Sequence, residues 1–148
     1  MPLELELVPA GTVVEANGEA SPVEISASTT RTFLCTLEIF QTIEQQSLDL
    51  SIWGSADGQD FGRMPLLKFP QRFYRGVTRL LLDVTLRPEV RFLRARWEVN
   101  RWGRVAPTPR FVIGLRAVEV PPMPRQVPVE RLNAAGEAPA QKSTETGS

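Results

Sequence analysis

The sequence predicts an all-β protein, an antiparallel β-sandwich that is jelly-roll-like. Apolar and polar residues alternate over many short stretches, as they do in strands with one buried and one solvated face. Gly, Pro, Asn and Asp interrupt these stretches at short intervals, and no long window has the periodicity of an amphipathic helix. Short strands that recur between turns are typical of sandwiches and jelly rolls.

In the N-terminal half, leucines at positions 3, 5 and 7 alternate with Glu4 and Glu6, which predicts a strand with one solvated face. The sequence Pro9-Ala10-Gly11 is expected to end this strand, and Asn17-Gly18 is typical of a hairpin turn. Further strands are predicted over residues 12–16, 23–27, 31–41 and 48–53, with a polar loop or a sheet-crossing link over residues 43–47.

The C-terminal half contains the most regular alternation in the chain. Over residues 90–99, apolar side chains fall on one side of an extended strand and charged side chains on the other. Trp97 belongs to the apolar side, so we expect it in the core. An edge strand or irregular extended chain is expected between Pro65 and Pro70, because proline cannot donate a ladder hydrogen bond. The remaining strands are predicted over residues 78–84 and 110–120.

Residues 1–120 are expected to form a single β-sandwich domain, because 148 residues suggest one domain with a sizeable core. After Val120 the composition changes to a segment rich in Pro, Ala, Gly, Ser and Thr. Such a segment has too little apolar surface to fold alone. We therefore expect residues 121–148 to be a disordered or extended C-terminal tail.

Charge is distributed unevenly along the chain, although the formal net charge is zero. Residues 1–62 contain ten acidic and one basic side chain, whereas residues 63–116 contain thirteen basic and three acidic ones. Most of the basic residues are arginine, which suits bidentate pairing with carboxylates or phosphates. Two arrangements are compatible with this split. In the first, acidic N-terminal strands lie beside basic later strands and neutralise them. In the second, the charges form separate poles on the surface that serve subunit assembly or bind an anionic ligand.

The residue types that most enzymes and metal sites need are scarce. The chain has no histidine and one cysteine, which removes histidine bases and most zinc sites, and no nucleotide-binding loop motif is present. We therefore expect no enzyme activity, no cofactor and no metal. Cys35 lies in an apolar run and is expected to be buried and inert. Asp57 and Asp60 lie in a predicted tight loop, where turn formation explains them better than weak calcium binding.

Exposed aromatic and arginine side chains are the candidates for an interaction surface, because interfaces favour both. The contact residues that we expect are Glu4, Glu6, Trp53, Tyr74, Arg94, Arg96, Arg101, Trp102 and Arg104. The two glutamates are expected to pair with Arg94 and Arg96, either within one chain or between copies. Neutral net charge and scarce lysine argue against a nucleic-acid partner.

Short motifs in the middle of the chain carry a family resemblance. Residues 51–61 read Ser-Ile-Trp-Gly-Ser-Ala-Asp-Gly-Gln-Asp-Phe, residues 82–84 read Leu-Asp-Val, and residues 90–97 read Val-Arg-Phe-Leu-Arg-Ala-Arg-Trp. This order resembles discoidin-like (coagulation factor 5/8 type C) jelly rolls and is similar to β-sandwich accessory proteins of phage particles. The resemblance covers residues 48–99 and implies the fold more than any activity.

These features favour a non-enzymatic structural or interaction module, a self-associating subunit of a larger assembly such as a phage or phage-like particle. Its partners would be other copies of itself or another structural subunit. The alternative is a carbohydrate-binding module, which a groove lined by Trp53, Tyr74 and Trp102 would favour. No apolar run is long enough to span a membrane, and the N-terminus lacks the basic start of a signal peptide. We therefore expect synthesis in the cytoplasm, no membrane partner, and association with a virion or similar particle.

Overall fold

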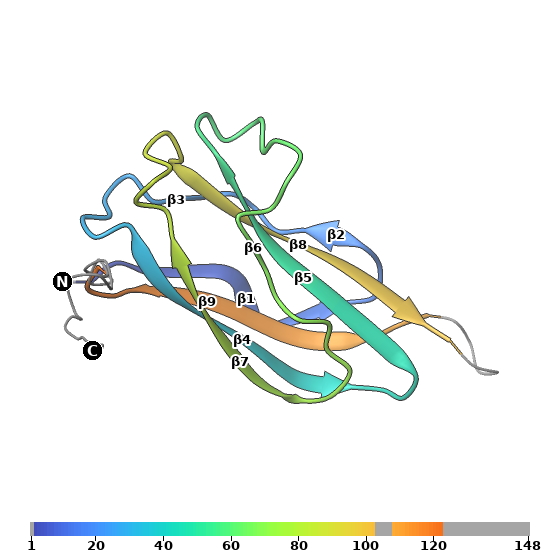
Figure 1. Cartoon of the computed structure of the whole chain (residues 1–148). Helices are drawn as coiled ribbons and strands as arrows, with labels where there is room; N and C mark the ends of the chain where they lie inside the picture. The colour runs from blue at the N-terminus through green and yellow to red at the C-terminus, as the bar shows by residue number, and fades with distance from the viewer. Residues whose placement is uncertain (1, 103–107, 123–148) are drawn as a thin grey trace, which may run out of the picture.

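The computed structural model of the protein describes residues 2–102 and 108–122, which fold into two antiparallel β-sheets packed face to face (Figure 1). The strands of this part of the chain are β1 (Glu4–Val14), β2 (Gly18–Glu19), β3 (Val23–Glu24), β4 (Thr32–Thr42), β5 (Gln46–Ser55), β6 (Leu67–Lys68), β7 (Gly76–Asp83), β8 (Phe92–Arg101) and β9 (Phe111–Glu119). Every pairing between them is antiparallel. The prediction of an all-β antiparallel sandwich is confirmed.

The two sheets have the strand order of a jelly roll. Sheet A has the order β1-β9-β4-β7, and sheet B has the order β2-β8-β5-β6, with β3 also paired to β8. Successive segments of the chain alternate between the sheets, except that β2 and β3 share sheet B and that β5 and β6 pair with each other. This alternation wraps the chain around one core, as in the jelly rolls that are built from two Greek keys.

The core lies between the sheets and follows the predicted alternation. On β4 the inward side chains Phe33, Cys35, Leu37 and Ile39 are all buried. Burial raises the pKa of the Cys35 thiol to about 12, so the expectation of a buried cysteine is confirmed. Trp97 packs against the edge of this core and stays partly exposed, so the prediction of a core tryptophan holds only in part.

Three local predictions are wrong, each because tertiary structure outweighs a local signal. Pro9-Ala10-Gly11 does not end β1 but lies in an irregularity of its pairing with β9, where Gly11 has a φ of 90°. Asn17-Gly18 does not close a hairpin, because the chain passes there from sheet A to sheet B. Residues 43–45 link β4 of sheet A to β5 of sheet B, as the sheet-crossing alternative predicted, but the predicted bounds are wrong. Gln46 already belongs to β5, and its buried amide exchanges hydrogen bonds with the backbone of Arg110.

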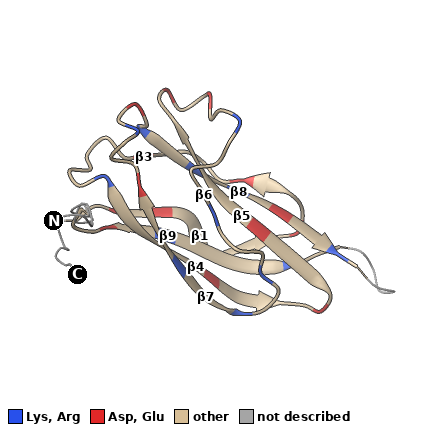
Figure 2. Ribbon diagram, viewed as in Figure 1, with Lys and Arg blue, Asp and Glu red and all other residues tan. Residues whose placement is uncertain are grey.

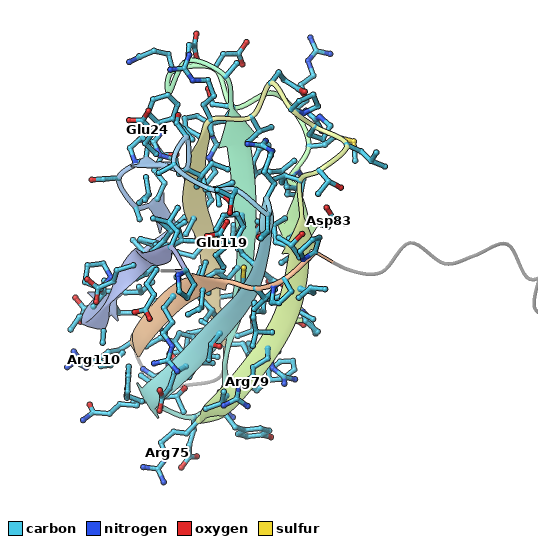
Figure 3. All side chains as sticks on the ribbon, turned by 90° about the vertical axis from the view of Figure 1, so that its left-hand side faces the viewer. Glu24, Arg75, Arg79, Asp83, Arg110 and Glu119 are labelled. Atoms are coloured by element: carbon cyan, nitrogen blue, oxygen red, sulfur yellow. The ribbon has the colours of Figure 1, made fainter. Side chains whose placement is uncertain are left out.

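At the end of β9, the buried carboxylate of Glu119 holds two other segments in place (Figure 3). Its Oε1 accepts a hydrogen bond from the backbone N–H of Leu3 at 3.0 Å. Its Oε2 accepts bonds from the Ser28 hydroxyl at 2.7 Å and from the N–H groups of Thr29 and Thr30 at 2.8 Å each. These bonds, led by that from Ser28, hold the pKa of Glu119 well below its usual range. The ionised carboxylate therefore ties the start of the chain and the loop before β4 to β9.

The strand β9 ends at Glu119, close to the predicted end of the domain. The backbone N–H of Val120 still bonds to the Thr32 carbonyl at 3.0 Å. The predicted tail lies outside the described residues from position 123 onward, so the domain boundary near Val120 stays a prediction. Residues 2–102 and 108–122 include no helix that is long and apolar enough to cross a membrane.

Candidate interaction surfaces

The strand β8 carries Arg94, Arg96 and Glu98 on the outer face of sheet B, which is turned away from the core. Arg94 and Arg96 both bind the carboxylate of Glu19 on β2, with nitrogen–oxygen distances of 3.2 and 3.0 Å. Arg94 also donates through Nε to the Ala20 carbonyl at 2.8 Å. The two guanidinium groups and the carboxylate thus form a network that ties the short strand β2 to β8.

Two aromatic rings extend this network. The guanidinium carbon of Arg96 lies 4.3 Å from the ring centroid of Trp53, and that of Arg94 lies 4.9 Å from the centroid of Phe61. Phe61 is buried, and Trp53 donates its indole N–H to the Ser51 hydroxyl at 2.8 Å. Cation–π contacts contribute from about 0.5 kcal/mol when exposed to about 2 kcal/mol when desolvated. Trp53 is therefore bound to partners within the chain, and Arg96 covers one face of its ring.

A groove of about 490 Å³ lies beside Trp53 on the same face. Its charged lining side chains are Asp49, Lys68, Arg96 and Glu98. Asp49 and Glu98 stand directly opposite each other on β5 and β8, which is unfavourable for like charges. Because the lining offers both signs of charge beside the two tryptophans Trp53 and Trp97, the groove suits a polar ligand better than a purely anionic one.

The tight loop after β5 has the expected turn chemistry. Oδ1 of Asp57 accepts hydrogen bonds from the backbone N–H groups of Asp60 at 2.9 Å and Gln59 at 2.8 Å, and Gly58 has a φ of 80°. These bonds, led by that from Asp60, lower the pKa of Asp57 to about 2. Across the described residues, no three His, Cys, Asp or Glu side chains are grouped so that they could hold a metal ion. Asp57 therefore shapes the loop.

Three aromatic side chains meet at one end of the sandwich, beside the turn between β4 and β5. The ring centroid of Phe73 lies 6.2 Å from that of Tyr74 and 6.3 Å from that of Trp102, the latter edge to face. Tyr74 is 79% exposed and Trp102 is 49% exposed. Ile43 in the turn is also exposed and lines a hollow of about 210 Å³ with the three rings. We call Ile43, Phe73, Tyr74 and Trp102 the aromatic end.

The outer face of sheet A carries exposed apolar side chains among charged ones. The exposed large apolar side chains on this sheet are Val13, Phe40, Val77 and Leu81. The charged side chains that the register places on the same face are Glu4, Glu6, Glu38, Arg79 and Arg116. None of these five charges takes part in an ion pair within the described part of the chain. This face therefore has both apolar area and ionic groups that form no ion pair among the described residues.

The predicted interaction residues thus fall on three separate surfaces. The structure places Glu4 and Glu6 on the outer face of sheet A, Trp53, Arg94 and Arg96 on the outer face of sheet B, and Tyr74, Arg101 and Trp102 at or beside the aromatic end. Arg104 lies outside the described residues. The predicted groove of three aromatic residues does not form, because Trp53 is remote from the other two.

The predicted pairing of Glu4 and Glu6 with Arg94 and Arg96 within one chain is wrong. The strands β1 and β8 belong to opposite sheets, and both arginines bind Glu19. The charge split and the matching alternation, on which the prediction rested, do not reveal that β1 and β8 lie in opposite sheets, and the acidic partner of both arginines comes from the short strand β2. Pairing between copies stays a prediction.

The charge split along the sequence does not persist in space. Figure 2 shows acidic and basic positions interspersed over both sheets. Early acids lie beside later bases, as Glu19 lies beside Arg96, and as Glu15 lies 3.7 Å from Arg110. The structure therefore supports the first of the two arrangements, in which neighbouring strands neutralise each other.

Sequence reasoning missed several exposed side chains that a closer reading of the alternation would have found. Phe40 has the opposite parity to the buried apolar side chains of β4, so the alternation already directs it outward. The run Leu80-Leu81-Leu82 is apolar at both parities, and a strand of that kind is typical of a sheet that is covered on both faces. For Phe73 there was no signal, because it lies in a loop.

The sequence matches no protein-family model and no curated protein. A function for this chain is therefore indicated only by the side-chain chemistry of these surfaces.

Proposed function

We propose that the chain is a non-enzymatic structural or interaction module that self-associates as a subunit of a larger assembly, such as a phage or phage-like particle. The observation that supports this most is the gathering of exposed large apolar side chains on the outer face of sheet A and at the aromatic end. Single exposed apolar residues are ordinary, but contiguous exposed patches are typical of sites of protein–protein contact.

The two surfaces adjoin each other. Phe40 and Val77 lie near the ends of β4 and β7 that lead to Ile43 and Tyr74 of the aromatic end. Figure 3 places Arg75 and Arg79 toward this same end of the sandwich. An apolar area with charged groups at its margin is the anatomy of a protein interface, whose centre is apolar and whose rim is polar.

The sheet edge adds a further feature. The strand β7 ends the order of sheet A and runs over eight residues with no neighbour on its outer side in the described part of the chain. An edge of this kind presents unpaired backbone groups to another chain. Jelly rolls occur in viral capsid proteins and also in lectins, so the fold supports assembly only together with these surfaces.

The proposal is tested by the oligomeric state of the full chain. We expect sedimentation velocity to show species heavier than the 16.5 kDa monomer, in proportions that rise with protein concentration. Replacing Phe40 and Val77 by serine should weaken the association, because it removes apolar area from the contact.

Met64 and Leu86 offer a matched control. They are 77% and 78% exposed but lie in loops away from both surfaces, so their replacement by serine should change nothing. A chain that stays monomeric at every concentration, or a control pair that disrupts association equally, would contradict the proposal.

The second candidate function is carbohydrate binding, which the aromatic end favours. Exposed rings beside the polar side chains of Thr42 and Gln45 could stack on a sugar and bind its hydroxyl groups. Titration with a panel of oligosaccharides, followed by tryptophan fluorescence, would detect it. We would expect Trp102→Ala to abolish the signal and Trp53→Phe to preserve it. A response that survives Trp102→Ala would exclude the aromatic end as the site.

A further inference from the structure

We infer that the outer face of sheet A binds the same face of a second copy of this chain, through a twofold axis that runs along the strands between β9 and β4. The inference rests on the proposed self-association, and it specifies the surface, the symmetry and the ion pairs.

One row of side chains across sheet A carries opposite charges at its two ends, so that it can pair with the same row of a rotated second copy. The register aligns Glu6 of β1 with Arg116 of β9, Arg116 with Thr36 of β4, and Thr36 with Arg79 of β7. The row therefore has a carboxylate on one edge strand and a guanidinium on the other edge strand. Neither Glu6 nor Arg79 has an ion-pair partner in the described part of the chain.

A twofold axis along the strands exchanges the two edges of the sheet, so that β1 of one copy faces β7 of the other. Glu6 then faces Arg79 of the second copy, and the symmetry makes this pair twice. Packed sheets cross at about 30°, which shifts facing positions by roughly one residue, a distance that glutamate and arginine side chains can span. A twofold axis across the strands would instead set β1 against β1 and oppose like charges.

The two middle strands fit the same axis. Because β4 faces β9 across the contact, Glu38 faces Gly114 of the second copy and comes near its Arg116, which is two positions away in the register and on the same side of the strand. A hollow of about 120 Å³ lies between β1, β9 and β4, with Ala10 packed over Gly114 and with Phe40 of the same chain in its wall. The twofold axis brings the exposed ring of Phe40 from the second copy over β9 at the edge of this hollow. An aromatic side chain that fills a pocket at the centre of an interface is a usual source of binding energy.

A second copy suits this face better than a partner of another kind. Two glutamates and two arginines, Glu6, Glu38, Arg79 and Arg116, alternate across its centre. A strongly acidic or strongly basic partner would set like charges against two of these four side chains. The rotated copy of the same face instead offers an opposite charge to all four.

The test uses charge reversal in the full chain. Glu6→Arg alone sets like charges opposite each other twice, and so does Arg79→Glu alone. We expect each variant to raise the dimer Kd at least about tenfold. An equimolar mixture of the two variants restores both pairs in the heterodimer, and its Kd should lie within about threefold of that of the original protein. The doubly reversed chain should recover in the same way as a homodimer.

Two further measurements keep the result interpretable. Thermal unfolding of each variant checks that the sandwich is intact, and Glu24→Arg, a reversal on β3 away from the face, should leave dimerisation unchanged. The inference is overturned if the single variants dimerise like the original protein, or if the mixture stays monomeric. If association is instead lost on replacing Phe73 and Trp102 by serine, the proposed function stands and the contact lies at the aromatic end. A monomeric original protein would overturn both.

Discussion

Removing the carboxylate of Glu119 is expected to cost a large part of the stability of the sandwich. Four hydrogen bonds of 3.0 Å or less end on its two oxygens. Hydrogen bonds to charged groups contribute about 1.5–3 kcal/mol each, so the lower value gives about 6 kcal/mol for four bonds. Water that enters the vacated site reduces this loss, and we expect Glu119→Ala to lower the free energy of unfolding by about 3–5 kcal/mol. Domains are stable by only about 5–15 kcal/mol in total.

Glu119→Gln tests the same contact without creating a cavity. The amide oxygen can still accept the bonds from the loop before β4, but the amide nitrogen then faces the N–H of Leu3, donor against donor. An unsatisfied buried donor and the lost charge together should cost about 2–3 kcal/mol. Urea unfolding with an unchanged m-value measures the loss. As a control, Glu24→Gln affects only one exposed bond to Ser26 and should stay within about 0.5 kcal/mol of the original protein.

The pH dependence of stability checks the ionisation. The folded-state pKa of Glu119 lies well below the usual value of 4.5, so the unfolded chain binds more protons as the pH falls. The stabilisation is therefore complete at neutral pH and is lost as the pH falls from about 5 toward the folded pKa. Glu119→Gln should flatten this acid limb of the stability curve. Equal slopes for the two proteins, or a loss below about 1 kcal/mol for Glu119→Ala, would refute the reasoning.

Three further substitutions or reactions test the packing. Trp97→Ala should lower the free energy of unfolding by about 2–3 kcal/mol, because it removes packing against the core and the hydrogen bond from the indole N–H to the Ala16 carbonyl. The loss is smaller than for a fully buried tryptophan, since Trp97 is partly exposed. An unchanged urea midpoint would place Trp97 outside the core. Cys35, with its pKa raised to about 12, should react with a thiol reagent only after unfolding, and rapid labelling of the folded chain would contradict its burial. Gly114→Ala should lower the stability of the folded chain by about 1–3 kcal/mol, because the added Cβ would lie 2.9 Å from the Cα of Ala10. Thermal unfolding measures the loss, and a stabilised variant would show that β1 can move away.

The alternation in the sequence predicted the long strands well, because a strand with one buried face repeats every two residues. The buried parity of β4 and the charged outer parity of β8 both follow from the order of apolar and polar residues alone. The failures are at Pro9-Ala10-Gly11 and Asn17-Gly18. Proline and glycine mark a change of backbone direction, but whether the chain bulges, turns back or crosses to the other sheet depends on which strand lies beside it.

The candidate surfaces were harder to predict, because they depend on which strands become neighbours. Arg94 and Arg96 were correctly placed on a solvent-facing side, but their partner Glu19 comes from a two-residue strand with no periodicity to detect. Tyr74 and Trp102 are far apart in the sequence and meet only because the loop before β7 and the end of β8 share one end of the sandwich. Composition identified these side chains as exposed but could not group them.

The inferred symmetry also bears on how a larger assembly could form. A twofold axis along the strands leaves both copies pointing the same way, so the two aromatic ends would lie side by side at one end of the dimer. One twofold contact closes on itself and stops at two copies, so growth beyond a dimer needs a second surface. The aromatic end, with exposed Tyr74 and Trp102, is a surface that this dimer leaves exposed for that role. Variants at Glu6 should therefore break the dimer, whereas variants at Trp102 should leave dimers that no longer form larger species.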